Sequence, residues 1–486
     1  MTEEQRFFIR ILAPVHIGCD EVYEPTGFVI DEEQGVLHAF DPLDFVRSLS
    51  GPERQQLSNI CKKGTVESIL ELYKFMRRKR FEGHPVAVCR GFVEHYRQTL
   101  SMSISDRRKI QQELNRFSIA RTAFSPTTER PFIPGSSVKG ALRTAYLNGR
   151  QTVKKLPPAK NAAQLEKDLL DGGAFETDPF RLLKVSDFHP VGPCRTKIIY
   201  AVNEKKRKDA KSKTRGLPLI LEVIEPGAVF VGTIQVLSPL SSSIIKTPLT
   251  EPAVLESAAS FYGKEKRRED EELMAAGLPH LRREHMEEGV PLRIGRHCGA
   301  ESLTIDGQRR IRIMQGRDKQ ATVSTRGATT FWLAAEEPRN YQKTTLQPFG
   351  WAVIGRLSAE IASQLAGQET ASPSVPKRQR AETAVEHTVE TASPLPDEET
   401  WEEAYVSYNA GGGGVLKATA KEGKKRAELR GVEKARRATD PSLHKKLFEK
   451  PKNIPRTIVT VRKIGNNYEI LSVMPMNLLE KTQDKP

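Results

Sequence analysis

The chain has 486 residues and a formal net charge of +15, because 76 Lys and Arg side chains exceed 61 Asp and Glu side chains. A chain of this length is too long to fold around a single hydrophobic core of ordinary size, so two or three domains are expected. No apolar stretch of about 20 residues occurs, which argues against a membrane-spanning helix. The positive charge favours a polyanionic partner, nucleic acid before others, although a basic surface that serves solubility alone has the same composition.

The five cysteines are scattered and form no C-x-x-C pair. They predict reduced thiols and no structural zinc site. The start, Met-Thr-Glu-Glu, lacks the charged and then apolar pattern of a signal peptide. We therefore expect a cytoplasmic protein.

The first part of the chain alternates between strand and helix patterns. Short apolar runs predict a strand over 7–12 and a hairpin built from 27–30 and 36–40. From 42 to about 114 the apolar spacing is helical, most clearly over 66–76. Strand patterns then follow at 181–185, 198–202, 217–224 and 228–237.

Residues 131–147 contain the most informative local pattern. Ile-Pro-Gly at 133–135 predicts a turn, Ser136 or Ser137 the N-cap, and the apolar spacing after them a helix. A helix start carries free N–H groups and the positive end of the helix dipole, and Lys139 and Arg143 lie four residues apart on one face beside it. The pattern predicts a phosphate-binding corner, although most turns of this kind bind nothing. It is not a nucleotide P-loop, because Ala141 follows Gly140 where that motif needs Lys and then Ser or Thr.

A strongly basic loop separates two of the predicted strands at residues 203–216. It is interpreted either as a hairpin whose tip touches RNA or as a solvated loop. Its cations are Lys205, Lys206, Arg207, Lys208, Lys211, Lys213 and Arg215.

The second part, residues 238–366, predicts another α+β half. Residues 251–289 have helical spacing with many charges, which indicates a largely exposed helical layer. Strand patterns follow at 293–305, 309–314, 329–334 and 351–357. Residues 367–400 are rich in Ser, Thr, Pro, Ala and Glu without periodic apolar positions, which is typical of a disordered linker.

Residues 401–478 predict a small, basic, β-rich module. Two strands flank the glycine run 411–414, and a terminal hairpin is expected at 457–471. A basic β-barrel with exposed tyrosines is suited to binding single-stranded RNA through stacking and charge.

Several short motifs occur in one order along the chain. They are Ile-Pro-Gly-Ser-Ser-Val-Lys-Gly-Ala-Leu-Arg at 133–143, Leu-Ala-Pro-Val-His-Ile-Gly at 12–18, the segment 23–31, Leu-Lys-Val-Ser-Asp at 183–187, Arg-Ile-Gly-Arg at 293–296 and Pro-Phe-Gly-Trp at 348–351. Over about residues 6–366 the chain resembles the RAMP superfamily, and within it the fifth-subunit family of the type III-A CRISPR Csm effector. His297-Cys298-Gly299 departs from the smaller turn expected there.

The resemblance implies tandem ferredoxin-like (RRM-like) halves with helical insertions, spanning 1–237 and 238–366. It implies a non-catalytic subunit that caps the backbone filament at the 3′ end of the guide RNA (crRNA) and supports guide maturation and antiviral RNA targeting. The basic loop becomes a candidate thumb. RNA contacts are implied for His16, Gly18, Gly135, Ser136, Ser137, Lys139, Gly140, Arg143, Arg293 and Arg296. Implied partners are crRNA, target RNA, other Csm subunits (chiefly the repeating backbone subunit and the small subunit) and host nucleases, with no membrane, cofactor or metal.

Two other functions stay open from the residues. A RAMP endoribonuclease acting on crRNA precursor or target RNA would need a base and an acid on either side of one phosphate. His16, Asp20 and Asp187 are the candidates, but no recognisable spacing pairs them, so no catalytic residue is predicted. A protein–protein scaffold without RNA contact is the other alternative.

Overall fold

The computed structural model describes residues 5–475 except for 78, 80–82, 104–106, 115–116, 173, 208–215, 240–243, 283–285, 287, 315–319, 364–397, 410–414, 421–424, 445–446, 449–453 and 465–466. The chain divides into two compact units, Met1–Pro376 and Lys377–Pro486. Among the described residues, no helix has the length and apolar character needed to cross a membrane.

The first sheet of unit 1 is antiparallel and is built around the N-terminal strand. Its order is β12 (Val290–Arg293), β17 (Trp351–Arg356), β1 (Gln5–Ile11), β11 (Val229–Val236) and β7 (Leu183–Val185), and β8 (His189–Val191) also pairs with β11. Side chains of β1 alternate between the two faces, as a strand requires. Phe7, Ile9 and Ile11 enter the main core, whereas Phe8 belongs to a smaller cluster with Val353.

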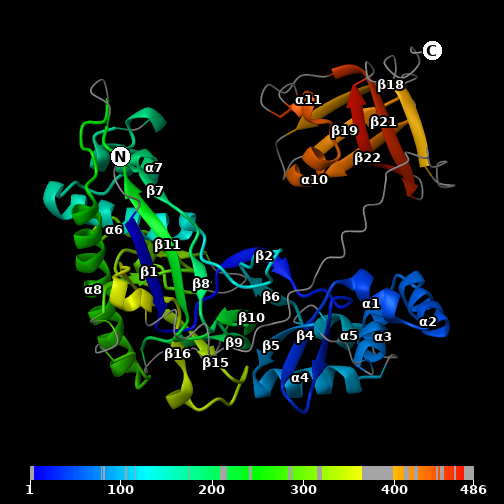
Figure 1. The fold of residues 1–486 in the computed structure, drawn as a ribbon, viewed down its shortest axis with the longest axis horizontal. Coiled ribbons are helices and arrows are strands. Elements are labelled where there is room, and N and C mark those ends of the chain that lie inside the picture. Colours follow the sequence, from blue (N-terminus) through cyan, green and yellow to red (C-terminus); the bar gives the residue numbers. More distant parts are fainter. Residues whose placement is uncertain are drawn as a thin grey trace. The chain divides into compact units, whose positions relative to one another are not determined.

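Two long helices cover the main-core face of this sheet (Figure 1). They are α6 (Gly135–Lys154) and α8 (Glu251–Ala276), and the shorter α7 (Ala162–Leu170) packs beside α6. The helix pattern predicted after the Ile-Pro-Gly turn is confirmed, since Val138, Leu142 and Ala145 are fully buried.

A second, mixed sheet forms the rest of the unit's β-structure. Its order is β2 (Gly18–Val22), β6 (Ile119–Thr122), β10 (Leu219–Ile224), β9 (Thr196–Lys205), β5 (His84–Val88), β4 (Val36–Ala39) and β3 (Phe28–Asp31), with β15 (Thr330–Ala335) on β9 and β16 (Gln347–Pro348) on β15. A separate pair joins β13 (Ile311–Ile313) and β14 (Thr322–Ser324).

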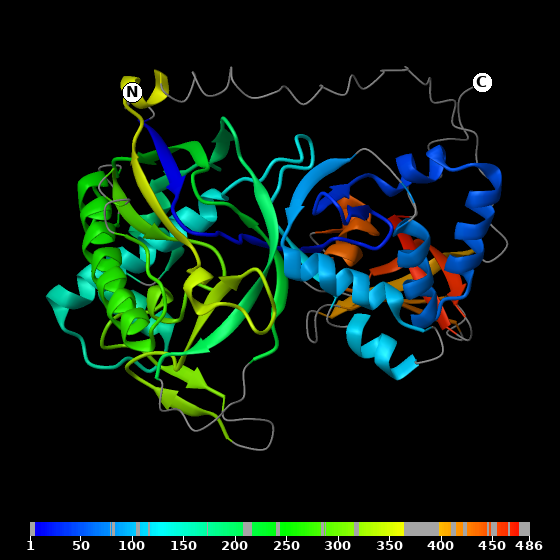
Figure 2. The ribbon, with the colours of Figure 1, turned by 90° about the horizontal axis from the view of Figure 1, so that it is seen from below.

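The predicted helical region after residue 42 accompanies this second sheet. It comprises α1 (Pro42–Ser48), α2 (Gly51–Lys62), α3 (Val66–Arg77), α4 (Arg90–Ser101) and α5 (Arg107–Leu114). Figure 2 shows these blue helices grouped apart from α6 and α8. Helices α3, α4 and α5 contribute buried side chains to the core of the second sheet.

Most predicted strands of unit 1 are present, and two expectations are wrong. Residues 293–305 are not a strand: β12 ends at Arg293, and a loop with the short 3-10 helix η4 (Glu301–Leu303) follows. Helix α8 is not a largely exposed layer, because it buries ten side chains, four of them charged. Each sheet takes strands from both predicted ranges, 1–237 and 238–366, since β17 pairs with β1 and β15 pairs with β9.

Unit 2 is a small closed β-barrel. Its strands are β18 (Glu398–Asn409), β19 (Val415–Thr419), β20 (Arg426–Arg430), β21 (Ile454–Ile464) and β22 (Asn467–Pro475). The helices α10 (Val432–Arg437) and α11 (Pro441–His444) contribute Ala435 and Leu443 to its core. The predicted strands and terminal hairpin of this module are confirmed. The predicted linker lies outside the described residues, except for 398–400, which begin β18.

Candidate functional site

Two of the sequence motifs meet at the first turn of α6. The Gly135 N–H donates a hydrogen bond of 2.8 Å to Oδ1 of Asp187, and Ile133 forms a β-bridge with Phe188. The contact is close, because a Cβ on Gly135 would lie 2.4 Å from the Val185 carbonyl oxygen. Glycine is therefore required here to let the two segments approach.

The predicted N-cap at Ser136 or Ser137 is wrong. The helix begins at Gly135 with Pro134 as its N-cap, and the N–H groups of Ser137 and Val138 both donate to the Pro134 carbonyl. A carboxylate at a helix N-terminus is stabilised by the N–H groups and by the dipole. The exposed Asp187 carboxylate thus occupies part of the predicted anion corner, and the Ser136 side chain beside it is also exposed.

Lys139 and Arg143 lie next to this corner and are engaged by the protein itself. The Lys139 ammonium donates to the Leu183 carbonyl at 2.7 Å, and partial burial lowers its pKa. The Arg143 guanidinium binds Asp178 at 2.9 Å and Glu166 at 2.5 Å. Burial opposes the charged form of Arg143, but its hydrogen bonds to the two carboxylates outweigh burial and raise its pKa. An ammonium has three donors, so Lys139 can still bind an incoming phosphate.

Three further motifs meet at a second place, where residues 12–18, 293–296 and 348–351 pack together. The Arg296 N–H donates to the His16 carbonyl at 2.8 Å, and the Gly350 N–H donates to the Pro14 carbonyl at 2.9 Å. Gly18 lies under the Arg296 side chain, where a Cβ would come within 2.2 Å of Nε. Motifs that lie far apart in the sequence therefore contact one another in the fold.

The side chain of His16 points into the protein. It is 2% exposed, and its Nδ1 lies 2.8 Å from the Glu222 carbonyl oxygen. Burial lowers its pKa. The neighbouring His297 packs against Trp332 and Phe349, and burial, with His16 and Arg296 nearby, lowers its pKa to about 4.

Arg293 is also internal, with 3% of its surface exposed. It forms an ion pair of 2.6 Å with Glu269 of α8 and donates from Nε to the Phe349 carbonyl at 3.0 Å. The Trp351 indole N–H donates to the same Glu269 carboxylate at 2.6 Å. The side chains of His16 and Arg293, two of the expected RNA contacts, are therefore buried and bound by other groups of the protein. Arg296 is exposed and pairs with Asp20 at 2.6 Å.

The basic loop is the connection of a hairpin, since β9 and β10 pair antiparallel over Leu219↔Ala201 to Ile224↔Thr196. At its base, the Lys206 ammonium binds Glu272 at 2.6 Å and Glu301 at 2.5 Å. Burial opposes ionisation of Glu301, but the charge of Lys206 outweighs it and lowers the Glu301 pKa to about 2. Lys206 is therefore an internal anchor, whereas Arg207 is exposed and Lys205 is half-buried. Lys208, Lys211, Lys213 and Arg215 lie outside the described residues.

The sequence interpretation missed the buried charges of α8. Phe261, Glu265, Glu269 and Leu273 recur every four residues and are all buried on one face. Glu265 binds Arg309 at 2.6 Å, so it is also paired inside the protein. The signal was present: charged residues in the same helical stripe as aromatic and aliphatic ones predict buried ion pairs rather than a solvated face.

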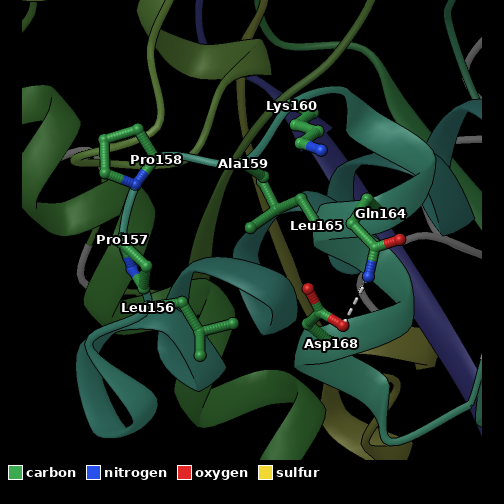
Figure 3. Close-up of a pocket in the computed structure, with 8 residues that line it drawn as sticks. All are labelled: Leu156, Pro157, Pro158, Ala159, Lys160, Gln164, Leu165 and Asp168. Carbon is green, nitrogen blue, oxygen red and sulfur yellow. Dashed lines mark hydrogen bonds between the residues drawn. The ribbon is translucent and has the colours of Figure 1, made fainter.

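A cavity of about 300 Å³ opens beside the C-terminal end of α6. Its lining comes from the connection to α7 and from α7 itself: Leu156, Pro157, Pro158, Ala159, Lys160, Gln164, Leu165 and Asp168 (Figure 3). The only hydrogen bond drawn there joins the Gln164 amide to Asp168 at 2.7 Å. Within the described parts of the chain, no three His, Cys, Asp or Glu side chains are grouped to hold a metal ion.

Comparison with known proteins gives a family match and more distant relatives. The model of the RAMP superfamily matches residues 8–279. The CRISPR system Cms protein Csm5 of Enterococcus italicus is 20% identical over 238 residues, which are 47% of this chain and 58% of that protein, so the match spans less than two thirds of the relative.

Two solved structures are also similar. One is a chain from a Csm–crRNA–target RNA ternary complex of a type III-A CRISPR-Cas system, 17% identical with a TM-score of 0.45, covering 73% of this chain and 100% of that chain. The other is Csm5 of T. onnurineus, 16% identical with a TM-score of 0.37, covering 59% of this chain and 89% of that one.

Proposed function

The chain belongs to the RAMP superfamily, and we propose that it is a non-catalytic, RNA-binding subunit of a type III-A CRISPR (Csm) ribonucleoprotein. In this proposal it resembles the Csm5 protein found among its relatives. It caps the backbone filament at the 3′ end of the crRNA and supports crRNA maturation and antiviral RNA targeting. Its partners are crRNA, target RNA and the other Csm subunits, chiefly the repeating backbone subunit and the small subunit, with host nucleases as further partners, and it acts in the cytoplasm.

The observation that carries the proposal is the junction of residues 133–143 with residues 183–187 inside the region matched by the family. This junction fixes the start of α6, where Ser136 and Gly140 are exposed and Lys139 is half-buried. Small side chains, hydroxyl groups and one cation can hold a phosphate without reading a base. A subunit that must accept every guide sequence needs contacts of this kind.

The topology of the first sheet supports a ferredoxin-like half. Strands β17, β1, β11 and β7 are neighbours in that order, with α6 after β1 and α8 after β11. This is a β-α-β-β-α-β arrangement. We propose that the second sheet, with its insertion at 42–114, is the other half of a tandem pair.

A non-catalytic role is supported by what the candidate acids and bases contact. Asp187 accepts the Gly135 N–H, Asp20 pairs with Arg296, and His16 is buried against a carbonyl oxygen. General acid–base cleavage needs two titrating groups within reach of one phosphate. Each of these three side chains instead contacts a different group of the protein; His16 is buried, whereas Asp20 and Asp187 are exposed.

The test is assembly of the complex with variants of the α6 start. Ser136→Glu and Lys139→Glu place negative charge at the proposed phosphate contact, and Lys160→Glu makes the same charge change at an exposed residue beside the cavity. We expect the first two variants to weaken retention of guide RNA in purified complexes about tenfold, and Lys160→Glu to leave it unchanged. Equal retention by all three would contradict a guide contact at α6. Cleavage of guide precursor or target RNA by the isolated protein would instead support the endoribonuclease alternative.

A further inference from the structure

The barrel of unit 2 has a specific connectivity. Its strands follow the order β18, β19, β20, β22 and β21, and β21 pairs back with β18 to close it. Strands β20 and β22 are parallel, the other pairs are antiparallel, and α10 and α11 lie between β20 and β21 in the chain. This is the Greek-key order of a five-stranded OB barrel, a fold whose outer face binds oligonucleotides in many proteins.

The fold alone does not identify a ligand. The ligand must be inferred from the residues on the outer face of β18, β19 and β20. Alternate side chains on β18, β19 and β20 are buried in the barrel core: Val406, Leu416, Ala418, Ala427 and Leu429. The positions between them therefore face outward. Pairing aligns Tyr405 with Thr419 and Thr419 with Arg426 in one row, and Ser407 with Lys417 and Lys417 with Glu428 in the next.

Tyr405 differs from the other described tyrosines of the barrel. Tyr408 packs against Phe448 with ring centroids 4.7 Å apart, and Tyr468 packs against Trp401 at 5.2 Å. Tyr405 is 53% exposed on the outer face. An exposed aromatic ring on the outer face of a sheet is a platform on which an unpaired base can stack. Each such stack contributes about 1–3 kcal/mol to the binding free energy.

The excess of positive charge in unit 2 favours the binding of a polyanion. Residues 398–475 contain 16 Lys and Arg and 10 Asp and Glu. Lys417 and Arg426 are exposed on the same face as Tyr405, one and two strands away respectively, although Lys417 forms an ion pair with Glu428 at 3.1 Å. Adjacent strands are about 4.8 Å apart, so the three side chains lie within about 10 Å. At this spacing the aromatic ring can stack on one base while the two cations bind the phosphates on either side of it.

We infer that the outer face of β18, β19 and β20 binds single-stranded nucleic acid, with a base stacked on Tyr405 and the adjacent phosphates held by Arg426 and Lys417. This site is separate from the start of α6 and does not depend on the function proposed for unit 1. It accepts single strands of any sequence, because stacking and phosphate contacts do not read bases. Duplex RNA is excluded from the stacking contact, since its bases are already paired and stacked.

The experiment uses the full chain and a 20-nucleotide oligouridine carrying 4-thiouridine, photocrosslinked and digested for peptide mapping. Crosslinks to peptides within 398–475 are measured relative to those within 5–363 in the same sample. We expect Tyr405→Ala and the double variant Lys417→Gln/Arg426→Gln to reduce the barrel crosslinks at least about fivefold, the lower end of the effect of losing one stacked base. Tyr405→Phe keeps the ring and should keep the signal. Arg437→Gln removes an exposed cation of α10, outside this face, and should have no effect.

Circular dichroism melting of each variant shows that the barrel remains folded. Competition by unlabelled single strands but not by a duplex of the same sequence would support the inference. Equal barrel crosslinking by Tyr405→Ala and the unchanged chain would overturn it, and so would equal competition by duplex. Crosslinks confined to 5–363 would also overturn it while leaving the function proposed for unit 1 intact.

Discussion

The Asp187 carboxylate accepts a hydrogen bond of 2.8 Å from the Gly135 N–H, and so joins two motifs that lie 52 residues apart in the chain. The acceptor that a Ser or Thr N-cap would have supplied locally comes instead from the segment after β7. This contact fixes the start of α6 and decides which groups remain free at the proposed guide contact.

Replacing Asp187 tests this capping role. Loss of an N-terminal acceptor typically costs 0.5–2 kcal/mol, and the charge interacts with the helix dipole. We expect Asp187→Ala to lower the free energy of unfolding of unit 1 by about 1 kcal/mol and Asp187→Asn by less, in urea titrations. Matched values for Asp187→Ala and the unchanged protein would show that the contact contributes nothing to stability.

Arg293 and Glu269 form a buried ion pair that Trp351 completes. Removal of one partner leaves a buried charge without compensation, which costs about 3–5 kcal/mol. Arg293→Met alone should therefore destabilise unit 1 by that amount. The double variant Arg293→Met/Glu269→Gln should recover part of the loss, and a double-mutant cycle from urea unfolding measures it. Additive losses would contradict the pairing.

We expect alanine substitutions at two glycines to change the stability of unit 1 in opposite directions. Gly350 has φ +85°, and a Cβ there would lie 2.2 Å from the Cys298 sulfur, so Gly350→Ala should cost about 3 kcal/mol. Gly140 lies inside α6 with open space around its Cβ position, so Gly140→Ala should stabilise by about 0.5–1 kcal/mol. Thermal melting of both variants checks the pair. If Gly140 allows the guide backbone to approach closely, the stabilised variant will also bind guide RNA more weakly.

How much of this arrangement the sequence predicted depends on how far apart the contacting residues are. The helix that follows Ile-Pro-Gly at 133–135 and the hairpin of 27–30 and 36–40 were predicted because their patterns are local. The N-cap was wrong because its substitute, Asp187, belongs to a different segment.

The same limit applies to the burial of two candidate site residues. His16 and Arg293 looked like surface contacts because a polar residue in a short motif gives no sign of its burial. Their partners, Glu222 and Glu269, come from elements far along the chain. No local pattern predicts that the motifs meet at two places, because each contact joins segments that are distant in the chain.

The depressed pKa of His297 predicts a pH dependence of stability. Its folded pKa is about 4 against an ordinary value of 6.5, so the unfolded chain binds more protons between these pH values. Stability should be unaffected by this group above pH 6.5 and should fall as the pH drops from 6.5 to 4, by at most about 1.4 kcal/mol per pH unit. His297→Gln should flatten the slope in urea unfolding between pH 7 and pH 4. An unchanged slope would mean that His297 titrates normally in the folded protein.

We propose that the start of α6 holds the guide RNA in a CRISPR ribonucleoprotein. The most direct test of this proposal is crosslinking with mass spectrometry on the assembled complex, with a photoreactive nucleotide placed near the 3′ end of the guide. We expect crosslinked peptides that cover residues 133–143, with a signal that Lys139→Glu reduces and Lys160→Glu retains. Crosslinks from the guide 3′ end to neighbouring subunits alone would contradict it, and would favour a protein–protein scaffold.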